Sequence, residues 1–269
     1  GQPDGSLKIW DAATGAASGT FRGHVGAITQ VAFSGDGRYV MSSSKDGTAR
    51  IWDLASPIDT PAGNGRGKAV TSIGITADGT RFVTTGPDKR ARVWRAGSQT
   101  APMVLGDQAN EVTVATISPD GSKVVTGGPD NVGRVWDTAT GKILVRLAGH
   151  TGPISSVAIS PDGRRAATGS EDATARIWDI QTGRQIAGLG PHATRVTSVV
   201  FSTDGTRVLT GSGTSARLWN IDGSEQLAAF LGNSGSVLTV ALSHNGQLAA
   251  SGGRDGSAHL WSPSSDKEI

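Results

Sequence analysis

The sequence predicts an all-β protein built as an array of one repeated unit. Its seven tryptophans recur every 42 residues, with a single interval of 41. Short β-type runs separated by Asp-Gly or Asn-Gly turns recur with the same period. A period of about 40–45 residues is typical of a stacked or radial array of one supersecondary unit. The repeat tryptophans are Trp10, Trp52, Trp94, Trp136, Trp178, Trp219 and Trp261.

Each repeat predicts a four-stranded antiparallel sheet. In the unit that contains Trp178, we expect strands over residues 154–159, 165–168, 174–178 and 184–189. The intervening turns are rich in Asp and Gly, and Asp followed by Gly supplies the positive φ that a tight hairpin requires. Because no linker interrupts the period, we predict one domain over residues 1–269.

The composition of the chain argues against several classes of partner and of covalent framework. The chain has 25 basic and 23 acidic residues, a net charge of +2 and no run of four basic residues, so a nucleic-acid partner is not expected. It has no cysteine, no stretch of 18 apolar residues and no N-terminal signal pattern, so neither a disulfide framework nor a membrane partner is expected. We expect a cytoplasmic protein.

The repeat resembles the WD-repeat β-propeller family over essentially the whole chain. Trp-Asp pairs close the third strands, as in Trp178-Asp179, and Gly-His pairs stand at Gly23-His24 and Gly149-His150. An Asp lies six residues before most of the tryptophans, and a Ser or Thr lies about four residues earlier still. The resemblance implies blades of four antiparallel strands, each holding a buried hydrogen-bonded tetrad. The complete tetrads are His24, Ser42, Asp46 and Trp52, then His150, Thr168, Asp172 and Trp178.

The tetrads contain Ser or Thr, His and Asp, but we expect no catalytic triad. A nucleophile needs an accessible oxygen beside an oxyanion site, whereas this group is expected inside a sheet with the indole N–H donating into it. No phosphate-binding loop is present, and three of the five histidines stand at the tetrad position. We therefore predict no catalytic residues, no metal site, no cofactor and no enzymatic activity.

Four repeats depart from the tetrad pattern. Arg66, Gln108 and Asn233 stand at the His position, and His192 is followed by Gly213 near the Asp position in a repeat that is one residue short. We expect these blades to be less stable, and Asp172→Ala to lower the melting temperature more than Asp88→Ala.

The number of blades depends on how the two ends of the chain are completed. The first repeat supplies two strands, five repeats are complete, and the last supplies three strands before a polar tail at 262–269. A seven-bladed ring is favoured, with its first blade incomplete in this chain and completed by an upstream segment or by another chain. The alternative is six blades, with residues 19–22 closing against 237–261. The outer strand at 55–68 is expected to be weak or looped, and 103–105 is a candidate edge strand.

The predicted function is a non-catalytic scaffold for a protein or peptide partner. WD-repeat propellers typically bind partners on the top face, which carries the fourth-to-first and second-to-third strand loops. Among the residues on these loops, Arg195 and Arg254 are the preferred anchors for a partner, because Arg is enriched at binding hot spots. The alternative is a sensor or regulatory tail of a larger signalling protein, such as a kinase or nucleotide-switch ATPase. The predicted partner-binding residues are Lys45, Lys89, Arg90, Glu111, Glu171, Arg195 and Arg254.

Overall fold

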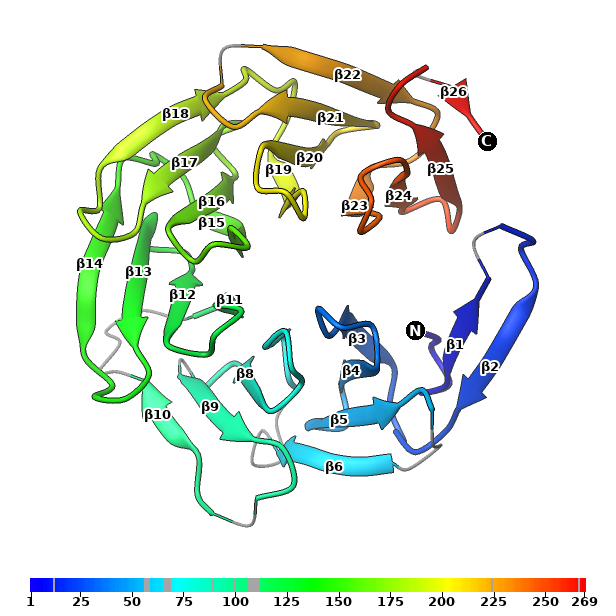
Figure 1. Ribbon diagram of the computed structural model, residues 1–269, viewed down its shortest axis with the longest axis vertical. Coiled ribbons are helices and arrows are strands. Elements are labelled where there is room, and N and C mark those ends of the chain that lie inside the picture. Colours follow the sequence, from blue (N-terminus) through cyan, green and yellow to red (C-terminus); the bar gives the residue numbers. More distant parts are fainter. Residues whose placement is uncertain are drawn as a thin grey trace. The chain divides into compact units, whose positions relative to one another are not determined.

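The computed structural model describes residues 1–11, 13–55, 59–64, 69–88, 90–98, 100–105, 112–223, 225–265 and 267–269, with the backbone alone for 59–64. These residues form 26 β-strands, and no helix occurs among them (Figure 1). The strands make six four-stranded sheets and one two-stranded sheet. The predicted all-β class with antiparallel strand pairing is confirmed.

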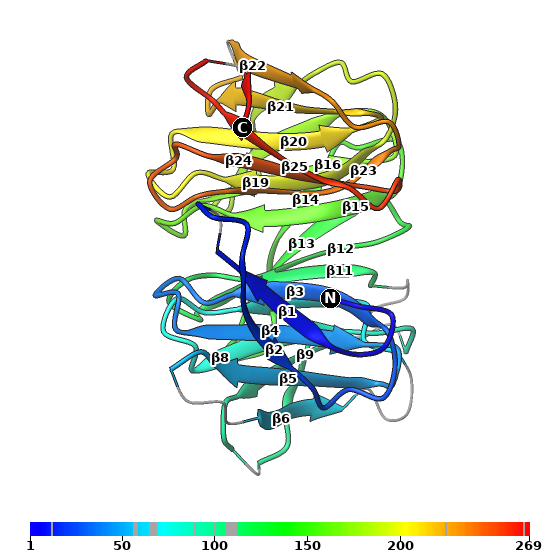
Figure 2. The ribbon, with the colours of Figure 1, turned by 90° about the vertical axis from the view of Figure 1, so that its right-hand side faces the viewer.

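The first three sheets follow the chain in order. The two-stranded sheet pairs β1 (Leu7–Trp10) with β2 (Ala17–Phe21). The next sheet, whose strands run one beside another in Figure 2, contains β3 (Ile28–Phe33), β4 (Tyr39–Ser44), β5 (Thr48–Asp53) and β6 (Asp59–Asn64). The third contains β7 (Ser72–Ile75), β8 (Arg81–Thr85), β9 (Ala91–Arg95) and β10 (Met103–Leu105).

Four more sheets complete the fold. The first contains β11 (Val114–Ile117), β12 (Lys123–Gly127), β13 (Val132–Asp137) and β14 (Ile143–Ala148). The second contains β15 (Ile154–Ile159), β16 (Arg165–Ser170), β17 (Ala175–Asp179) and β18 (Gln185–Leu189). The third contains β19 (Val196–Phe201), β20 (Arg207–Ser212), β21 (Ser215–Asn220) and β22 (Gln226–Leu231). The fourth contains β23 (Val237–Leu242), β24 (Ala249–Gly253), β25 (Ala258–Ser262) and β26 (Lys267–Glu268).

The turns between first and second strands show why the chain reverses at Asp-Gly. Between β15 and β16, the Ser160 hydroxyl donates to Asp162 Oδ1 at 2.5 Å and accepts from the Arg165 amide at 2.9 Å. Gly163 then adopts φ +67°, a left-handed conformation that costs a residue without a Cβ little. The Ser-X-Asp-Gly sequence therefore closes its own hairpin with side-chain hydrogen bonds.

The chain divides into two compact units, residues 1–124 with 137–142 and residues 125–136 with 143–269. In the second unit, neighbouring sheets pack face to face through apolar side chains. Ala167 and Ile177 of one sheet share a core with Val196, Phe201 and Trp219 of the next. Burial of a side chain of this size contributes about 1.5–3 kcal/mol, so these contacts dominate the stability of the stack.

Hydroxyl groups on the first strands add polar contacts between neighbouring sheets. Thr197 Oγ1 donates to the Gly211 carbonyl of its own sheet at 3.1 Å and lies 2.7 Å from the Val237 carbonyl of the next sheet. Ser155 makes the equivalent contacts one repeat earlier, to Gly169 and Val196. The first strands are thus joined through side chains rather than through a backbone ladder.

The structure corrects the predicted blade count. It contains six four-stranded blades and not the favoured seven, because β1 and β2 pair with each other and with no other described strand. Six blades was the alternative, but residues 19–22 do not close the last one. Lys267–Glu268 pairs with β25 instead, so part of the predicted polar tail at 262–269 is a strand.

Two predictions about outer strands can also be compared with the structure. Residues 59–64, expected to be weak or looped, pair with β5 as a six-residue strand. The candidate edge strand Met103–Leu105 pairs with β9, as expected. The single-domain prediction over residues 1–269 stays a prediction.

Candidate functional site

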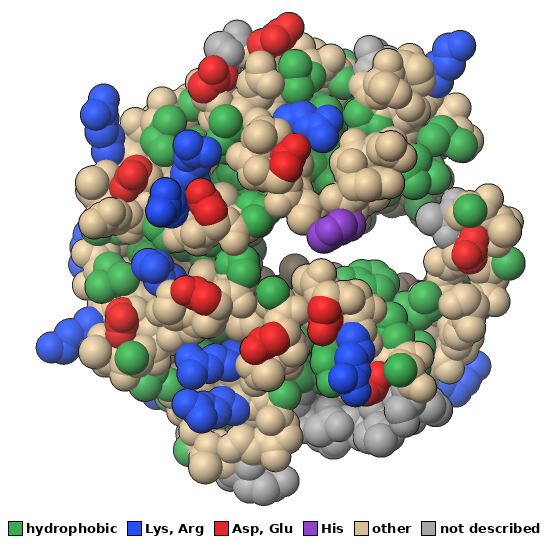
Figure 3. Space-filling view, in the orientation of Figure 1, with side chains coloured by type: hydrophobic (Ala, Val, Ile, Leu, Met, Phe, Trp, Pro, Cys, Tyr) green, Lys and Arg blue, Asp and Glu red, His purple; other side chains and the backbone are tan. Residues whose placement is uncertain are grey.

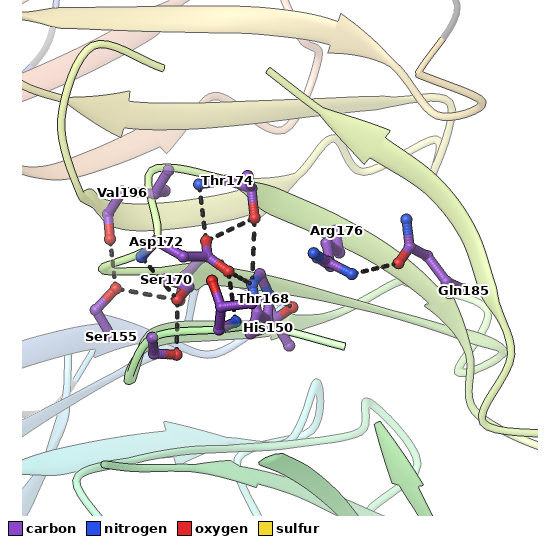
Figure 4. Close-up of polar contacts among 12 residues, drawn as sticks. His150, Ser155, Thr168, Ser170, Asp172, Thr174, Arg176, Gln185 and Val196 are labelled. Atoms are coloured by element: carbon purple, nitrogen blue, oxygen red, sulfur yellow. Dashed lines mark hydrogen bonds and ion pairs between the residues drawn. The ribbon is translucent and has the colours of Figure 1, made fainter. Parts of the chain in front are cut away.

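The sheet of β15–β18 holds one predicted tetrad, of which Figure 4 shows His150, Thr168 and Asp172. The Trp178 indole Nε1 donates to Thr168 Oγ1 at 2.8 Å, and Thr168 Oγ1 lies 2.7 Å from His150 Nε2. His150 Nδ1 lies 2.8 Å from Asp172 Oδ2. The four side chains therefore form one continuous polar chain that runs from the indole to the carboxylate.

The sheet of β3–β6 repeats this geometry. Trp52 Nε1 donates to Ser42 Oγ at 2.8 Å, and Ser42 Oγ lies 2.8 Å from His24 Nε2. His24 Nδ1 lies 3.0 Å from Asp46 Oδ2. Hydrogen bonds in such a buried network contribute roughly 1 kcal/mol each, and removal of one member leaves its neighbour unsatisfied at a greater cost.

The tetrad carboxylates are held as anions. Burial raises the pKa of Asp46, but hydrogen bonds from Thr48, Val25 and His24 outweigh it and lower the pKa to about 2. The same balance lowers the pKa of Asp172 below its ordinary value. Burial lowers the pKa of His150, against the opposing effect of Asp172. A neutral imidazole between a hydroxyl and a carboxylate is thus the expected resting state.

The arrangement does not present a nucleophile. The Ser42 and Thr168 side chains belong to residues with no solvent exposure, and each hydroxyl oxygen already accepts from an indole N–H. A substrate carbonyl could not reach either oxygen without opening the sheet. The chemistry that this geometry supports is structural, because it fixes the loop before the first strand to the second and third strands.

A third histidine occupies the same position without its carboxylate. His192 Nε2 lies 2.8 Å from Thr210 Oγ1, which also accepts from Trp219 Nε1 at 2.9 Å. His192 Nδ1 is buried without a hydrogen-bond partner among the described residues. Burial and the charge of Arg217 lower the pKa of His192 to about 4. The short repeat places Gly213 where the other blades have Asp, as the sequence indicated.

Two arginines that sequence reasoning missed take over the role of His in other blades. Arg92 Nη1 lies 3.2 Å from Asp88 Oδ1, and its Nη2 contacts Asp88 Oδ2. Arg134 makes the equivalent ion pair with Asp130. The side chain of Arg92 is only 7% exposed, so this is a buried charge pair. The sequence did contain a signal. Trp94 and Trp136 are each preceded by an Arg two positions earlier, and in both repeats a residue other than His stands at the His position.

The two loops predicted to form the binding face lie together in three of the blades. In the sheet of β15–β18, the Glu171 amide donates to the Pro153 carbonyl at 2.9 Å. Lys45 makes this bond to Ala27, and Arg254 makes it to Ser236, at 2.9 and 2.8 Å. The second-to-third strand turn therefore lies against the segment that enters the first strand. Both loops consequently occupy the same end of the blade.

The repeated strands, turns and tetrad positions agree with the result of a comparison against protein families. The family described as WD domain, G-beta repeat matches residues 15–53, 56–95, 103–137, 141–179, 183–220 and 224–262, which together make up most of the chain. The chain belongs to the WD-repeat family. A comparison with curated proteins found no match. WD-repeat propellers typically serve as scaffolds for protein interactions and are generally non-catalytic.

The predicted partner-binding residues lie at these WD-repeat loops where the structure describes them. Lys45, Arg90, Glu171, Arg195 and Arg254 are all exposed. Lys89 and Glu111 lie outside the described residues, as do Arg66 and Gln108.

One pair of these residues is brought together across two blades. Arg195 Nη1 lies 3.7 Å from Glu171 Oε1, and both side chains are about half exposed. An exposed pair of this kind contributes little to stability, at most about 1 kcal/mol. Its effect is to place charges of opposite sign side by side at the blade loops. Acidic and basic side chains also lie interspersed on the face shown in Figure 3.

Two further observations concern metals and membranes. The described residues contain no group of three or more His, Cys, Asp or Glu side chains placed to hold a metal ion. In the same part of the chain, no helix has the length and apolar character needed to span a membrane.

Proposed function

We propose that this WD-repeat chain is a non-catalytic scaffold that binds a protein or peptide partner through the loops at one end of its blades. The observation that carries the proposal is the Glu171–Arg195 pair, which joins the loops of two neighbouring blades at 3.7 Å with both side chains half exposed. The backbone bond from Glu171 to Pro153 holds the acidic side of the pair on a fixed turn.

These loops suit a polar partner. Arg195 and Arg254 are exposed guanidinium groups, and a guanidinium binds a carboxylate through two parallel hydrogen bonds. Because backbone hydrogen bonds hold these loops, as between the Arg254 amide and the Ser236 carbonyl, a partner would meet a preorganised surface and lose little entropy in ordering it. Acidic side chains on the partner are therefore the expected contact groups.

The test is a pull-down that compares two charge reversals. Arg195→Glu/Arg254→Glu changes the proposed loops, and Arg164→Glu/Arg184→Glu changes exposed arginines in the turns at the other ends of the strands. We expect a specific prey to be retained by the unmodified chain and by the second variant, and lost from the first. Retention by all three, or equal loss from both variants, would contradict the proposed face.

A further inference from the structure

One blade has the histidine of the tetrad without its carboxylate. In the sheet of β19–β22 (the short blade), the turn between the second and third strands is one residue shorter, and Gly213 stands where Asp172 stands in the sheet of β15–β18. His192 is 6% exposed, and its Nδ1 atom is buried without a hydrogen-bond partner among the described residues. The Ala173 carbonyl accepts from the His192 backbone amide at 3.1 Å, but it does not bond to Nδ1. The nitrogen that binds a carboxylate in two other blades therefore has no such partner in this part of the chain.

The backbone amide after the histidine position also lacks the acceptor that it has in other blades. In three blades this amide donates to the Asp carboxylate at 2.9–3.0 Å. The amides belong to Val25, Thr151 and Ser234, and the carboxylates to Asp46, Asp172 and Asp255. In the short blade the equivalent amide belongs to Ala193, which is exposed and has no acceptor within the described residues. A second donor therefore follows His192 directly, as it does in the complete tetrads.

Arg217 is a third group whose equivalents bind a carboxylate. It lies two residues before Trp219, and in two blades without the histidine the arginine at this position pairs with the Asp. These pairs are Arg92 with Asp88 and Arg134 with Asp130. Arg217 Nη1 instead donates to the Pro191 carbonyl at 3.1 Å, and the described residues contain no acidic partner for it. After burial, the charge of Arg217 is the next cause that lowers the pKa of His192, so its guanidinium acts on this site.

These three groups indicate one kind of ligand. The imidazole Nδ1, the amide and the guanidinium each bind a carboxylate at the same repeat position in another blade. The neutral imidazole carries its proton on Nδ1 when Nε2 accepts from the Thr210 hydroxyl, which lies 2.8 Å away. A carboxylate at this place would therefore accept from all three, through charge-assisted hydrogen bonds that are roughly twice as strong as neutral ones.

The surroundings of the site indicate that the carboxylate comes from a polypeptide. In the complete tetrads it is carried by the turn between the second and third strands, so it reaches the histidine from the loop face. Pro191 and residues 193–195 are exposed on the short blade, where a chain lying on the loops would contact them. Gly190 lies against Nδ1, since a Cβ at this residue would stand 3.1 Å from it. Residues 190–191 must therefore move aside for the ligand, which also releases Arg217 from the Pro191 carbonyl.

We propose that the short blade binds an Asp or Glu side chain of the partner polypeptide, with the carboxylate held by His192 Nδ1, the Ala193 amide and Arg217. The partner thus supplies the group that the chain itself supplies in the complete tetrads. This inference rests on the proposed function and deepens it, because it names the residue type by which the partner is held.

The probe is the peptide acetyl-Ala-Asp-Ala-amide, followed through the imidazole Cε1–Hε1 resonances of the five histidines. The His192 resonance is assigned with His192→Asn. We expect a saturable shift of His192 and none at His24 or His150, whose Nδ1 atoms already lie against a carboxylate. The peptide with Asn in place of Asp should bind about tenfold more weakly, because hydrogen bonds to a charged group are lost. An unmoved His192 resonance, equal binding of the two peptides or an equal shift at His150 would overturn the proposal.

A variant that supplies its own carboxylate is the matched control. Gly213-Thr214→Lys-Asp-Gly restores the length of the turn and copies residues 45–47. We expect it to melt roughly 2–4 °C higher than the same variant with Lys-Asn-Gly, because its aspartate meets the three donors. The peptide should no longer shift its His192 resonance. Equal melting temperatures for the two turns would show that these donors do not bind a carboxylate.

Acetate distinguishes a polypeptide ligand from a free carboxylate. It has the same carboxylate but makes no contacts with residues 193–195, so we expect it to bind more weakly than the peptide. Acetate that binds as tightly as the peptide would assign the site to a free carboxylate and overturn the proposal.

The pull-down separates this site from the proposed loop face. We expect the prey to be lost from the Lys-Asp-Gly variant, in which the chain fills the site without loss of stability. Prey retained by this variant but lost from Arg195→Glu/Arg254→Glu would leave the loop face standing and overturn the carboxylate site. Prey lost from the Lys-Asp-Gly variant alone would support the carboxylate site and contradict the role of Arg195 and Arg254.

Discussion

At the scale of single residues, one aspartate position has three sets of partners. Asp46 and Asp172 accept from a histidine. Asp88 pairs with a buried arginine four residues later. Asp255 accepts from the Ser234 hydroxyl at 2.7 Å, in a blade where Asn stands in place of His. The carboxylate is therefore the common feature, while the group that it satisfies differs between blades.

The Asp88–Arg92 pair argues against the stability order expected from the sequence. Asp88→Ala leaves a buried guanidinium without its counter-ion, which typically costs about 3–5 kcal/mol. Asp172→Ala leaves a neutral imidazole and amide groups unsatisfied, at about 1–3 kcal/mol. We now expect Asp88→Ala to be at least as destabilising as Asp172→Ala in urea denaturation.

A double variant tests whether the unpaired charge of Arg92 is what destabilises Asp88→Ala. Asp88→Ala/Arg92→Met removes the unpaired charge while keeping an unbranched side chain in the core, so it should recover much of the stability lost in Asp88→Ala. The matched variant Asp172→Ala/Arg176→Met should recover none, because Arg176 donates to Gln185 and not to the aspartate. Equal recovery in both would show that charge burial is not the reason.

His192 is expected to make the stability of the folded protein decrease at low pH. Its folded pKa of about 4 lies below the ordinary value of 6.5, so the folded state favours the neutral imidazole. Its contribution to stability is complete above pH 6.5 and is lost as the pH falls from 6.5 towards 4, by up to about 3 kcal/mol. His192→Asn, which copies Asn233 at the same repeat position, should flatten the decline of the melting temperature across this interval. An unchanged slope would show that His192 does not titrate there.

At the scale of elements, the sequence predicted strands wherever apolar runs and Asp-Gly turns coincide. Met103–Leu105 was found in this way, because its three residues are apolar and lie between turns. The Asp59–Asn64 strand was not, because its residues Asp-Thr-Pro-Ala-Gly-Asn have little β propensity and pairing with β5 decides their conformation. Lys267–Glu268 was missed for the same reason.

The candidate site was predictable to a similar degree. The tetrad partners followed from the resemblance to WD repeats, because the four residue types stand at the family's positions within the fixed period. The Arg92–Asp88 pair did not, since two residues four apart on a turn and the following strand can meet only when the turn has the right shape. The Glu171–Arg195 contact joins different blades, so it depends on how their loops face each other and no local pattern encodes it.

At the scale of the whole molecule, stability in a repeat array comes from each unit and its nearest neighbours. Second strands such as β16 and β20 are almost entirely buried, whereas β2 and β26 are mostly exposed. Amide protons exchange through local opening, whose free energy falls where burial and pairing are incomplete. The second and third strands of the complete blades should therefore exchange last.

The sharpest comparison is between β1 and β17, which occupy the same position in their repeats. Among the described strands, β17 is paired on both sides and β1 on one. In hydrogen exchange followed by NMR, we expect the β17 amides to be protected at least tenfold more than those of β1, because opening β17 must break two ladders and expose Trp178. Protection of β1 equal to that of β17 would mean that packing against the sheet of β3–β6 alone can hold a strand in place. Burial of Leu7, rather than strand pairing, would then be the dominant stabilising interaction in this part of the chain.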